Sequence, residues 1–168
     1  DAIIAFAQAG AKRSIDHPST KTLREHGTAR TILTSQSIGG LPTRNWTSGS
    51  FELAEQISGQ EMTRTILKKN EACWACAVRC KRVVEAKEPY VIDPQYGGPE
   101  YETMSALGSY VGVGDLPAVA KAAEICNRLG IDTISAGGTI AFAMECFEKG
   151  LLTLEDTGGI ELTFGNKE

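Results

Sequence analysis

Three of the five cysteines in this sequence lie within eight residues, Cys73-Trp74-Ala75-Cys76-Ala77-Val78-Arg79-Cys80. On a helix, side chains at positions i, i+3 and i+7 lie along one face, so this spacing predicts that the three thiols point in the same direction. Grouped thiolates suit a soft metal centre, and a Cys-x2-Cys pair with one further cysteine nearby is typical of iron–sulfur sites. We expect the apolar residues between the cysteines to shield the site partly from water.

Two other kinds of site also use closely spaced cysteines. A structural zinc site normally needs a second ligand pair at matching spacing, and none is visible. A redox-active Cys-x-x-Cys of the thioredoxin type expects a strand–helix–strand context, which this region does not show. Iron–sulfur is therefore favoured over zinc, although three cysteines are one ligand short of four. Cys126 or Cys146 could supply the fourth ligand, but free cysteine behaves as a small apolar residue, so we expect both to be buried structural thiols.

Length and composition indicate one folded globular domain. The 168 residues are 42% hydrophobic and 23% charged, which is enough for a compact core. The net charge of -4 argues against nucleic acid as the main partner, and no apolar run approaches the length of a membrane span. Bunched cysteines do not resemble a secreted disulfide framework, so we expect a reducing cytoplasm. Because the first residue is Asp1, we expect a piece of a longer polypeptide.

Helical patterns dominate the chain, and most are bounded by a capping residue, a glycine or a proline. Helices are expected over residues 1–9 (ended by Gly10), from Ser19 or Thr20 to Glu25, over 28–37, 51–57 and 60–69, from Pro99, over 116–129 after the cap Asp115, and over 133–147. β-structure is expected in a small hairpin formed by residues 83–84 and 90–92, and in a short strand over 160–164. The expected fold class is mainly α: a multihelical domain with a small β-hairpin.

Three further features carry groups that could act at a site. The loop over residues 41–46 combines a cation, an amide and an aromatic ring, and loops often carry function. Glu100 and Glu102 fall in the first helical turn after Pro99, where acids ordinarily complement the helix dipole. The alternative is that one of them is an acid–base group beside a buried reaction centre. Gly137-Gly138, in the last helix, allow close approach of backbone or ligand.

Four motifs also occur in a fixed order, and together they carry a resemblance. They are Leu41-Pro42-Thr43-Arg44-Asn45, Cys73-x2-Cys76-x3-Cys80, Gly98-Pro99-Glu100-Tyr101-Glu102-Thr103 and Asn127-Arg128-Leu129-Gly130-Ile131-Asp132-Thr133-Ile134-Ser135. From about Leu23 to its end, the chain resembles the middle domain of the tungsten-containing aldehyde ferredoxin oxidoreductases. The resemblance implies that residues 1–168 are one helical domain, the family's second, without the N-terminal β-rich domain and the C-terminal helical domain. It assigns no role to Arg44 and Asn45.

In that family, the three domains enclose tungsten or molybdenum held by two pterin dithiolenes, with a [4Fe-4S] cluster nearby. The resemblance implies that Cys73, Cys76 and Cys80 are three ligands of the cluster, and that the fourth cysteine lies in the following domain. A family glutamate near the metal falls in the third motif. It matches Glu102 rather than Glu100, which favours the acid–base role over the dipole role.

The fourth motif resembles the family's pterin-contact sequence Asp-x-x-Gly-Leu-Asp. The match implies that Asn127, Gly130, Ile131 and Asp132 contact the pterin. Asn127 replaces an acid, which keeps a hydrogen-bond acceptor but loses the charge, and Ile131 replaces leucine. A break between two helices exposes backbone groups that could bind polar pterin rings.

The resemblance implies an enzyme that oxidises small aldehydes to carboxylic acids and passes electrons through the cluster to ferredoxin. Its partners would be ferredoxin, the aldehyde and the neighbouring domains of the same chain. One alternative is an iron–sulfur electron-transfer or structural module without its own catalysis, which would need all four ligands in this chain. Another is a family relative that acts on a different carboxyl-level or aromatic thioester substrate. We expect the isolated domain to be inactive, without tungstopterin or a complete cluster, and its cysteine stretch to be poorly ordered.

Overall fold

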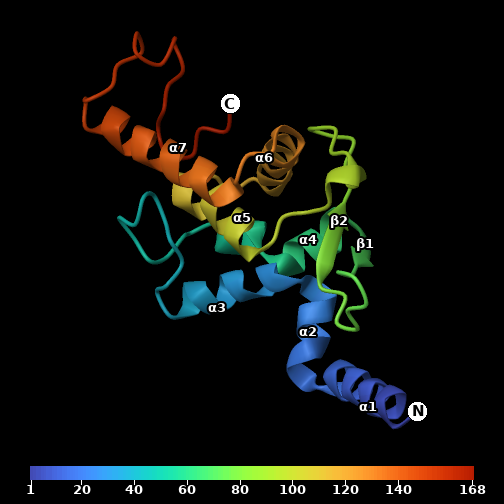
Figure 1. The fold of residues 1–168 in the computed structure, drawn as a ribbon. Helices are drawn as coiled ribbons and strands as arrows, with labels where there is room; N and C mark the ends of the chain where they lie inside the picture. Colours follow the sequence, from blue (N-terminus) through green and yellow to red (C-terminus); the bar gives the residue numbers. More distant parts are fainter.

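The computed structural model describes residues 1–168 and is mainly α-helical (Figure 1). Seven α-helices, four short 3-10 segments and one two-stranded antiparallel sheet make up the fold, which confirms the expected fold class. In chain order they are α1 (Ala2–Asp16), α2 (Pro18–His26), η1 (Thr28–Arg30), α3 (Thr31–Ser37), η2 (Ala54–Ile57), α4 (Gly59–Thr65), β1 (Leu67–Glu71), β2 (Lys81–Val84), η3 (Pro94–Tyr96), α5 (Tyr101–Ala106), η4 (Ser109–Val111), α6 (Leu116–Leu129) and α7 (Thr133–Glu148).

The hydrophobic core forms around the short helix α5, which packs against α3, α6 and α7. Its 21 buried residues come from all of these helices and from α4, β2 and the loops between them. The largest fully buried apolar side chains include Ile32, Phe51, Met62 and Met104. No helix of the chain is both long and apolar enough to cross a lipid bilayer.

Helix α1 projects away from this core and packs only against α2 (Figure 1). None of its residues is buried. The prediction that Gly10 ends it is wrong, because the helix continues to Asp16. A single glycine inside a helix costs only about 1 kcal/mol relative to alanine, and good helix formers follow it.

The sheet differs from the predicted hairpin. A helix is expected over residues 60–69, but α4 stops at Thr65 and β1 pairs antiparallel with β2, with Leu67 opposite Val84. Residues 90–92 do not form the second strand; only an isolated bridge joins Ala86 to Ile92. Long-range backbone pairing of β1 with β2, most of whose residues are buried, overrides the helical propensity of the lysines in β1.

Two other expectations about local structure also fail. Residues 160–164 alternate in polarity but form no strand, because no neighbouring strand is available to pair with them. The segment instead folds back over η4, where the Gly165 N–H donates to the Val111 carbonyl at 2.9 Å. Within residues 51–57, only the 3-10 segment η2 is helical.

The two long C-terminal helices agree with prediction. Asp115 caps α6 by accepting a hydrogen bond from the Ala118 N–H at 3.1 Å, and Gly130 ends it with a left-handed φ of 69°. Gly137 lets α7 approach α5 closely, since a Cβ placed there would lie 2.3 Å from the Ala106 carbonyl oxygen. The expected close approach at the glycine pair is therefore a contact between helix backbones.

Candidate metal centre

The three clustered cysteines lie in the loop of residues 72–80, which joins β1 to β2, and not on a helix. Ala75 and Arg79 have left-handed φ angles of 53° and 59°, which a continuous right-handed helix does not allow. The predicted helical face is therefore wrong. The strands on either side pair with each other, so the segment between them must reverse the chain direction.

The three thiols nevertheless belong to one short loop. Cys73 is exposed, while Cys76 and Cys80 are half-buried, and none forms a disulfide. Burial raises the pKa of the Cys80 thiol, and the charges of Glu100, Cys76 and Cys73 contribute in the same direction. The charges of two loop thiols and of Glu100 thus all act on the Cys80 thiol.

The expected apolar shield around the thiols is only partly present. The Trp74 side chain is 99% exposed and Ala75 is also exposed, while Ala77 and Val78 are half-buried. A short loop between two strands has no interior of its own, so residues near its tip face away from the domain. Within this chain, the thiol loop is open to solvent on the Trp74 side.

The other two cysteines lie on helices, Cys126 on α6 and Cys146 on α7. Cys126 lies in the hydrophobic core, as expected, and burial raises the pKa of its thiol. Cys146 is half-buried on α7, so it is less enclosed than predicted. Figure 1 shows the loop between β1 and β2 beside α2, whereas α7 lies on the opposite side of the domain. The loop itself supplies three of the five cysteines.

The two candidate acids occupy different environments at the start of α5. Glu100 precedes the helix, is half-buried and accepts a hydrogen bond from the Thr28 hydroxyl, which in turn accepts one from the Tyr101 N–H at 2.9 Å. Glu102 lies in the first turn and is exposed. Glu100 is the acid whose charge acts on Cys80, so the structure places it nearer the thiols. The role of Glu102 stays a prediction.

Residues 127–132 comprise the end of α6 and the turn of residues 130–132 that leads into α7. The Asn127 amide donates to the Tyr96 carbonyl at 3.0 Å, and Gly130 supplies the left-handed residue that ends α6. Asp132 caps α7 by accepting a hydrogen bond from the Ser135 N–H at 2.7 Å. The Ser135 side chain, and after it this N–H, lower the pKa of the Asp132 carboxyl. Ile131 is 48% exposed. The turn therefore exposes one apolar side chain while its polar side chains hold the helix ends.

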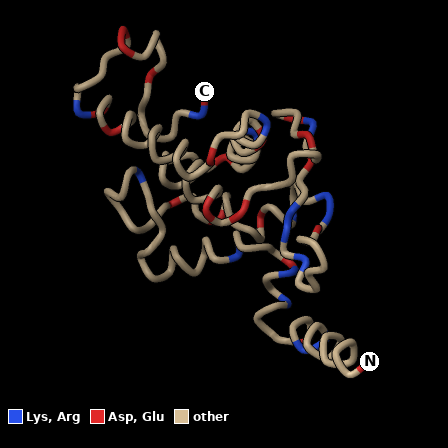
Figure 2. The backbone as a smooth tube through the Cα atoms, viewed as in Figure 1, with Lys and Arg blue, Asp and Glu red and all other residues tan.

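A cleft of about 650 Å³ is lined both by the start of α5 and by the end of α6. It lies between the β1–β2 hairpin and η3 and includes Glu100 and Asn127 in its lining. Its hairpin side carries four cations, Lys68, Lys69, Lys81 and Arg82, and one acid, Glu71, which pairs with Lys69. Figure 2 shows that Lys and Arg residues predominate along the two strands. Sequence reasoning missed this basic group because it treated β1 as helix, which separates its lysines from those of β2.

The loop over residues 43–48 uses its polar groups for structural contacts. Arg44, Asn45 and Trp46 have left-handed φ angles of 44°, 50° and 64°. The Arg44 and Asn45 N–H groups both donate to η4 carbonyl oxygens at 3.0 Å. The Asn45 amide also donates to Glu145 of α7, and the Arg44 guanidinium pairs with Glu52. Arg44 and Asn45 thus anchor this loop to η4, α7 and a neighbouring loop.

Comparison with known proteins identifies the family. The family model described as "Aldehyde ferredoxin oxidoreductase, domains 2 & 3" matches residues 6–168. The chain belongs to the aldehyde ferredoxin oxidoreductase family. The predicted resemblance is therefore confirmed.

Several members of the aldehyde ferredoxin oxidoreductase family can be compared directly. The chain is 41% identical over 147 residues to the tungsten-containing aldehyde ferredoxin oxidoreductase of Thermococcus kodakarensis, which is 87% of this chain and 24% of that protein. It is 40% identical over 149 residues to the enzyme of the same name from Pyrococcus abyssi, with the same two shares. An aliphatic sulfonate oxidoreductase, WOR-like subunit, of Pyrococcus furiosus is 29% identical over 152 residues, 89% of this chain and 24% of that subunit. The chain spans about a quarter of the length of these curated relatives.

The thiol loop of this family member suits a cluster better than a single metal ion. No three His, Cys, Asp or Glu side chains converge closely enough to hold one ion. A zinc site needs all its ligands about 2.0–2.3 Å from a single metal. In a four-iron cluster each cysteine binds a different iron, so the ligands stand farther apart. Three free thiols on one short loop fit three corners of such a cluster.

Proposed function

We propose that the chain is the cluster-bearing helical domain of a tungsten or molybdenum pterin oxidoreductase. The whole enzyme would oxidise aldehydes to carboxylic acids and pass the electrons through a [4Fe-4S] cluster to ferredoxin. The observation that carries the proposal is the hairpin loop with its three neighbouring free thiols, in a chain 41% identical to a tungsten-containing aldehyde ferredoxin oxidoreductase. Free thiols throughout suit a reducing compartment, and we place the enzyme in the cytoplasm.

In this proposal, the thiolates of Cys73, Cys76 and Cys80 hold three irons, and a cysteine outside the chain holds the fourth. When bound, the cluster supplies one-electron transfer. The exposed Trp74 side of the loop is where a neighbouring domain would cover the site and bring the missing ligand. Covering the site removes water, which is one of the factors that set a cluster potential.

The pterin side of the site would be formed by the turn at Asn127, Gly130, Ile131 and Asp132. Asn127 lines the same cleft as the two strands that carry the thiol loop between them. The positive charge of that cleft would favour anionic groups of a pterin cofactor. Backbone groups at the end of α6 and the exposed Ile131 side chain are the parts of the turn free to contact it.

Glu102 would hold and move a proton for the reaction. Its carboxylate is exposed in this chain and makes no ion pair or hydrogen bond, so it is free to project toward a neighbouring domain. In the whole enzyme, a neighbouring domain would bring the reacting group to this carboxylate, which would then transfer a proton to or from it. Glu100 instead serves as the acid that links α5 to Thr28.

A second candidate function keeps the fold and changes the substrate. The similarity to an aliphatic sulfonate oxidoreductase, WOR-like subunit, favours this possibility, but the 29% identity is lower than the 41% to the aldehyde enzyme. We therefore favour an aldehyde substrate. A free-standing iron–sulfur module is disfavoured because Cys126 is enclosed in the core and Cys146 lies on α7, away from the loop.

The test uses the full-length enzyme, purified without oxygen. Changing Cys73, Cys76 or Cys80 singly to alanine should abolish the electron paramagnetic resonance signal of the cluster and electron delivery to ferredoxin. Cys126→Ala and Cys146→Ala are matched controls that should keep both. A normal signal in all three loop variants would exclude this cluster site.

The isolated 168-residue chain provides the complementary measurement. Iron and sulfide analysis should find less than a complete cluster, because the fourth ligand lies elsewhere. Four irons and four sulfides per chain, lost on changing Cys126 or Cys146, would instead support the free-standing module.

A further inference from the structure

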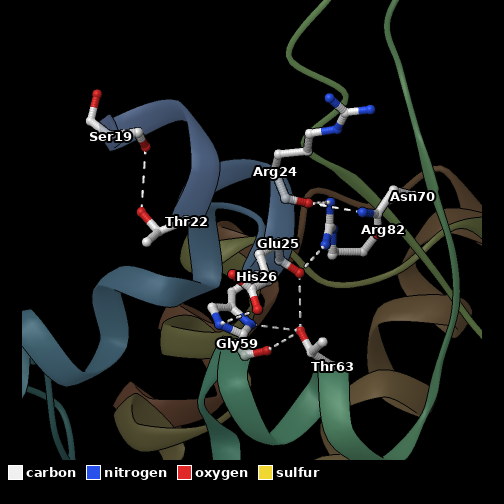
Figure 3. A network of polar contacts seen from close by, with 9 residues as sticks. All are labelled: Ser19, Thr22, Arg24, Glu25, His26, Gly59, Thr63, Asn70 and Arg82. Carbon is white, nitrogen blue, oxygen red and sulfur yellow. Dashed lines mark hydrogen bonds and ion pairs between the residues drawn. The ribbon is translucent and has the colours of Figure 1, made fainter. Parts of the chain in front are cut away.

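Arg82 lies directly beneath the thiol loop, two residues after Cys80, and its side chain is only 1% exposed. From β2 it points toward the last turn of α2 (Figure 3). Arginine is almost never fully buried unless its charge is paired. A buried arginine next to three thiols is therefore a feature that needs its own explanation.

All hydrogen bonds of the Arg82 guanidinium go to backbone carbonyl oxygens. Two acceptors belong to the thiol loop: Nε donates to Cys80 at 3.0 Å and Nη2 donates to Arg79 at 3.2 Å. Two belong to the end of α2: Nη1 donates to Glu25 at 2.8 Å and Nη2 to Arg24 at 2.9 Å. Because the guanidinium is a planar fork of fixed geometry, it holds the end of the thiol loop at a fixed position against α2.

The neighbouring residues secure the same point. The Asn70 amide of β1 donates to the Arg24 carbonyl at 2.9 Å, and the Thr63 hydroxyl of α4 donates to the Glu25 carbonyl at 3.3 Å (Figure 3). The carbonyl groups at a helix C-terminus lack partners within the helix. The end of α2 is therefore a firm base on which Arg82 anchors the loop.

Two glycines leave room for the Arg82 side chain. A Cβ on Gly27 would lie 3.1 Å from Cδ and Nε of Arg82, and a Cβ on Gly98 would lie 3.0 Å from its Cβ. Gly27 also has a left-handed φ of 66°. Backbone thus encloses the arginine from both sides, so its guanidinium has little freedom to turn elsewhere.

The positive charge of Arg82 has no direct anionic partner. None of the ion pairs in the structure includes it. Glu100 is the one carboxylate whose charge acts on it, and that carboxylate already accepts the Thr28 hydroxyl. A buried cation is costly unless negative charge lies close by. Thiolates and an anionic cluster on the loop would supply that charge.

We propose that Arg82 is a positioning residue that fixes the Cys80 end of the cluster loop and balances the negative charge of the bound cluster. This inference rests on the proposed cluster site. Adding one electron to the cluster increases the negative charge beside the buried cation. Arg82 therefore stabilises the reduced form and makes the cluster easier to reduce than it would be beside a neutral residue.

The experiment compares Arg82→Gln and Arg82→Lys in the full-length enzyme, with Arg64→Gln as the matched control. Arg64 is exposed on α4 and pairs with Glu61. Arg64→Gln therefore removes the same positive charge as Arg82→Gln, but from the surface. The readouts are the iron content per chain and the cluster potential, measured by a dithionite titration followed by electron paramagnetic resonance. Arg82→Gln should lower the equilibrium constant for one-electron reduction of the cluster at least tenfold. This corresponds to a shift of the cluster potential by about 59 mV to lower values. Arg64→Gln should leave the potential unchanged.

Arg82→Lys separates the two parts of the role. Lysine keeps the charge but not the fork, so the potential should stay near that of the wild type while a chelator removes iron faster. If Arg82→Gln does not accumulate, the lysine variant tests both parts: its rate of iron loss tests the positioning role, and a potential lower by about 59 mV or more despite the retained charge would overturn the charge role. A lysine variant that loses iron no faster than the wild type would overturn the positioning role, and a wild-type potential in Arg82→Gln would overturn the charge role.

A third readout needs no cluster. In the metal-free 168-residue chain, amide hydrogen exchange over residues 72–80 should be faster in Arg82→Lys than in the wild type or Arg64→Gln. Unchanged exchange would contradict the anchoring. If the wild-type enzyme binds no iron, the proposed cluster site fails, and this readout still tests the anchor independently.

Discussion

The adjacent glycines of α7 provide a sharp test of the fold, because one substitution should have opposite effects at two neighbouring positions. A Cβ on Gly138 would meet nothing closer than Tyr110 Cε1 at 3.9 Å. Gly138→Ala should therefore stabilise the domain by about 0.5–1 kcal/mol, since alanine restricts the unfolded chain and favours the helix. A Cβ on Gly137 would lie 2.3, 2.6 and 2.8 Å from three atoms of Ala106.

The backbone of α5 cannot rotate away from such a contact as a flexible side chain could. Gly137→Ala should therefore push α7 and α5 apart by roughly 1 Å, which forfeits a quarter to a half of the dispersion energy of the affected contacts. Overpacking of this kind costs about 1–3 kcal/mol, more than the gain in helix propensity. We expect a net loss of about 1–2 kcal/mol for Gly137→Ala.

The two variants should thus differ in unfolding free energy by about 1.5–3 kcal/mol, which for a chain of this size corresponds to roughly 3–12 °C in melting temperature. Urea and thermal unfolding of the 168-residue chain, followed by circular dichroism, would measure the difference. If Gly137→Ala proved as stable as Gly138→Ala, the close packing of α7 on α5 would be refuted.

Two further predictions concern single carboxylates. Glu102→Gln in the full-length enzyme should lower turnover by roughly two to four orders of magnitude with cofactor content intact, because a proton carrier is lost. Glu100→Gln, measured in parallel, should have a smaller effect; normal turnover in Glu102→Gln would assign Glu102 to the helix dipole alone. Asp132→Ala should lower the melting temperature at neutral pH, where the ionised carboxylate caps α7. Folding holds the pKa of Asp132 below its ordinary value of 3.8, so this deficit should shrink as the pH falls from 3.8 through the folded-state pKa, and an equal deficit in strong acid would contradict the cap.

The sequence alone was sufficient to predict features that depend on a few neighbouring residues. Asp115 was expected to cap α6 and Gly130 to end it, and both do so through contacts within one helical turn. The mainly α fold class followed from several such signals in succession. The family followed from four ordered motifs, which need no knowledge of the fold.

The setting of the cysteine motif and of the two acids before and in α5 could be predicted only in part. Grouping of Cys73, Cys76 and Cys80 followed from their spacing, which keeps them close together in either a helix or a loop. Their exposure did not follow, because it depends on which segments flank the loop. For the acids, spacing alone could not show that Glu100 lies near the thiols while Glu102 is exposed.

Tertiary structure decided the hairpin and the setting of the thiol loop. The lysines of β1 are compatible with helix or strand, and the pairing of β1 with β2 selects the strand. Arg82 reads as an ordinary surface cation in the sequence, yet its guanidinium binds the Arg24 carbonyl, which is 58 residues away. Such contacts form only when the core brings distant segments together and excludes water from between them, so no local pattern encodes them.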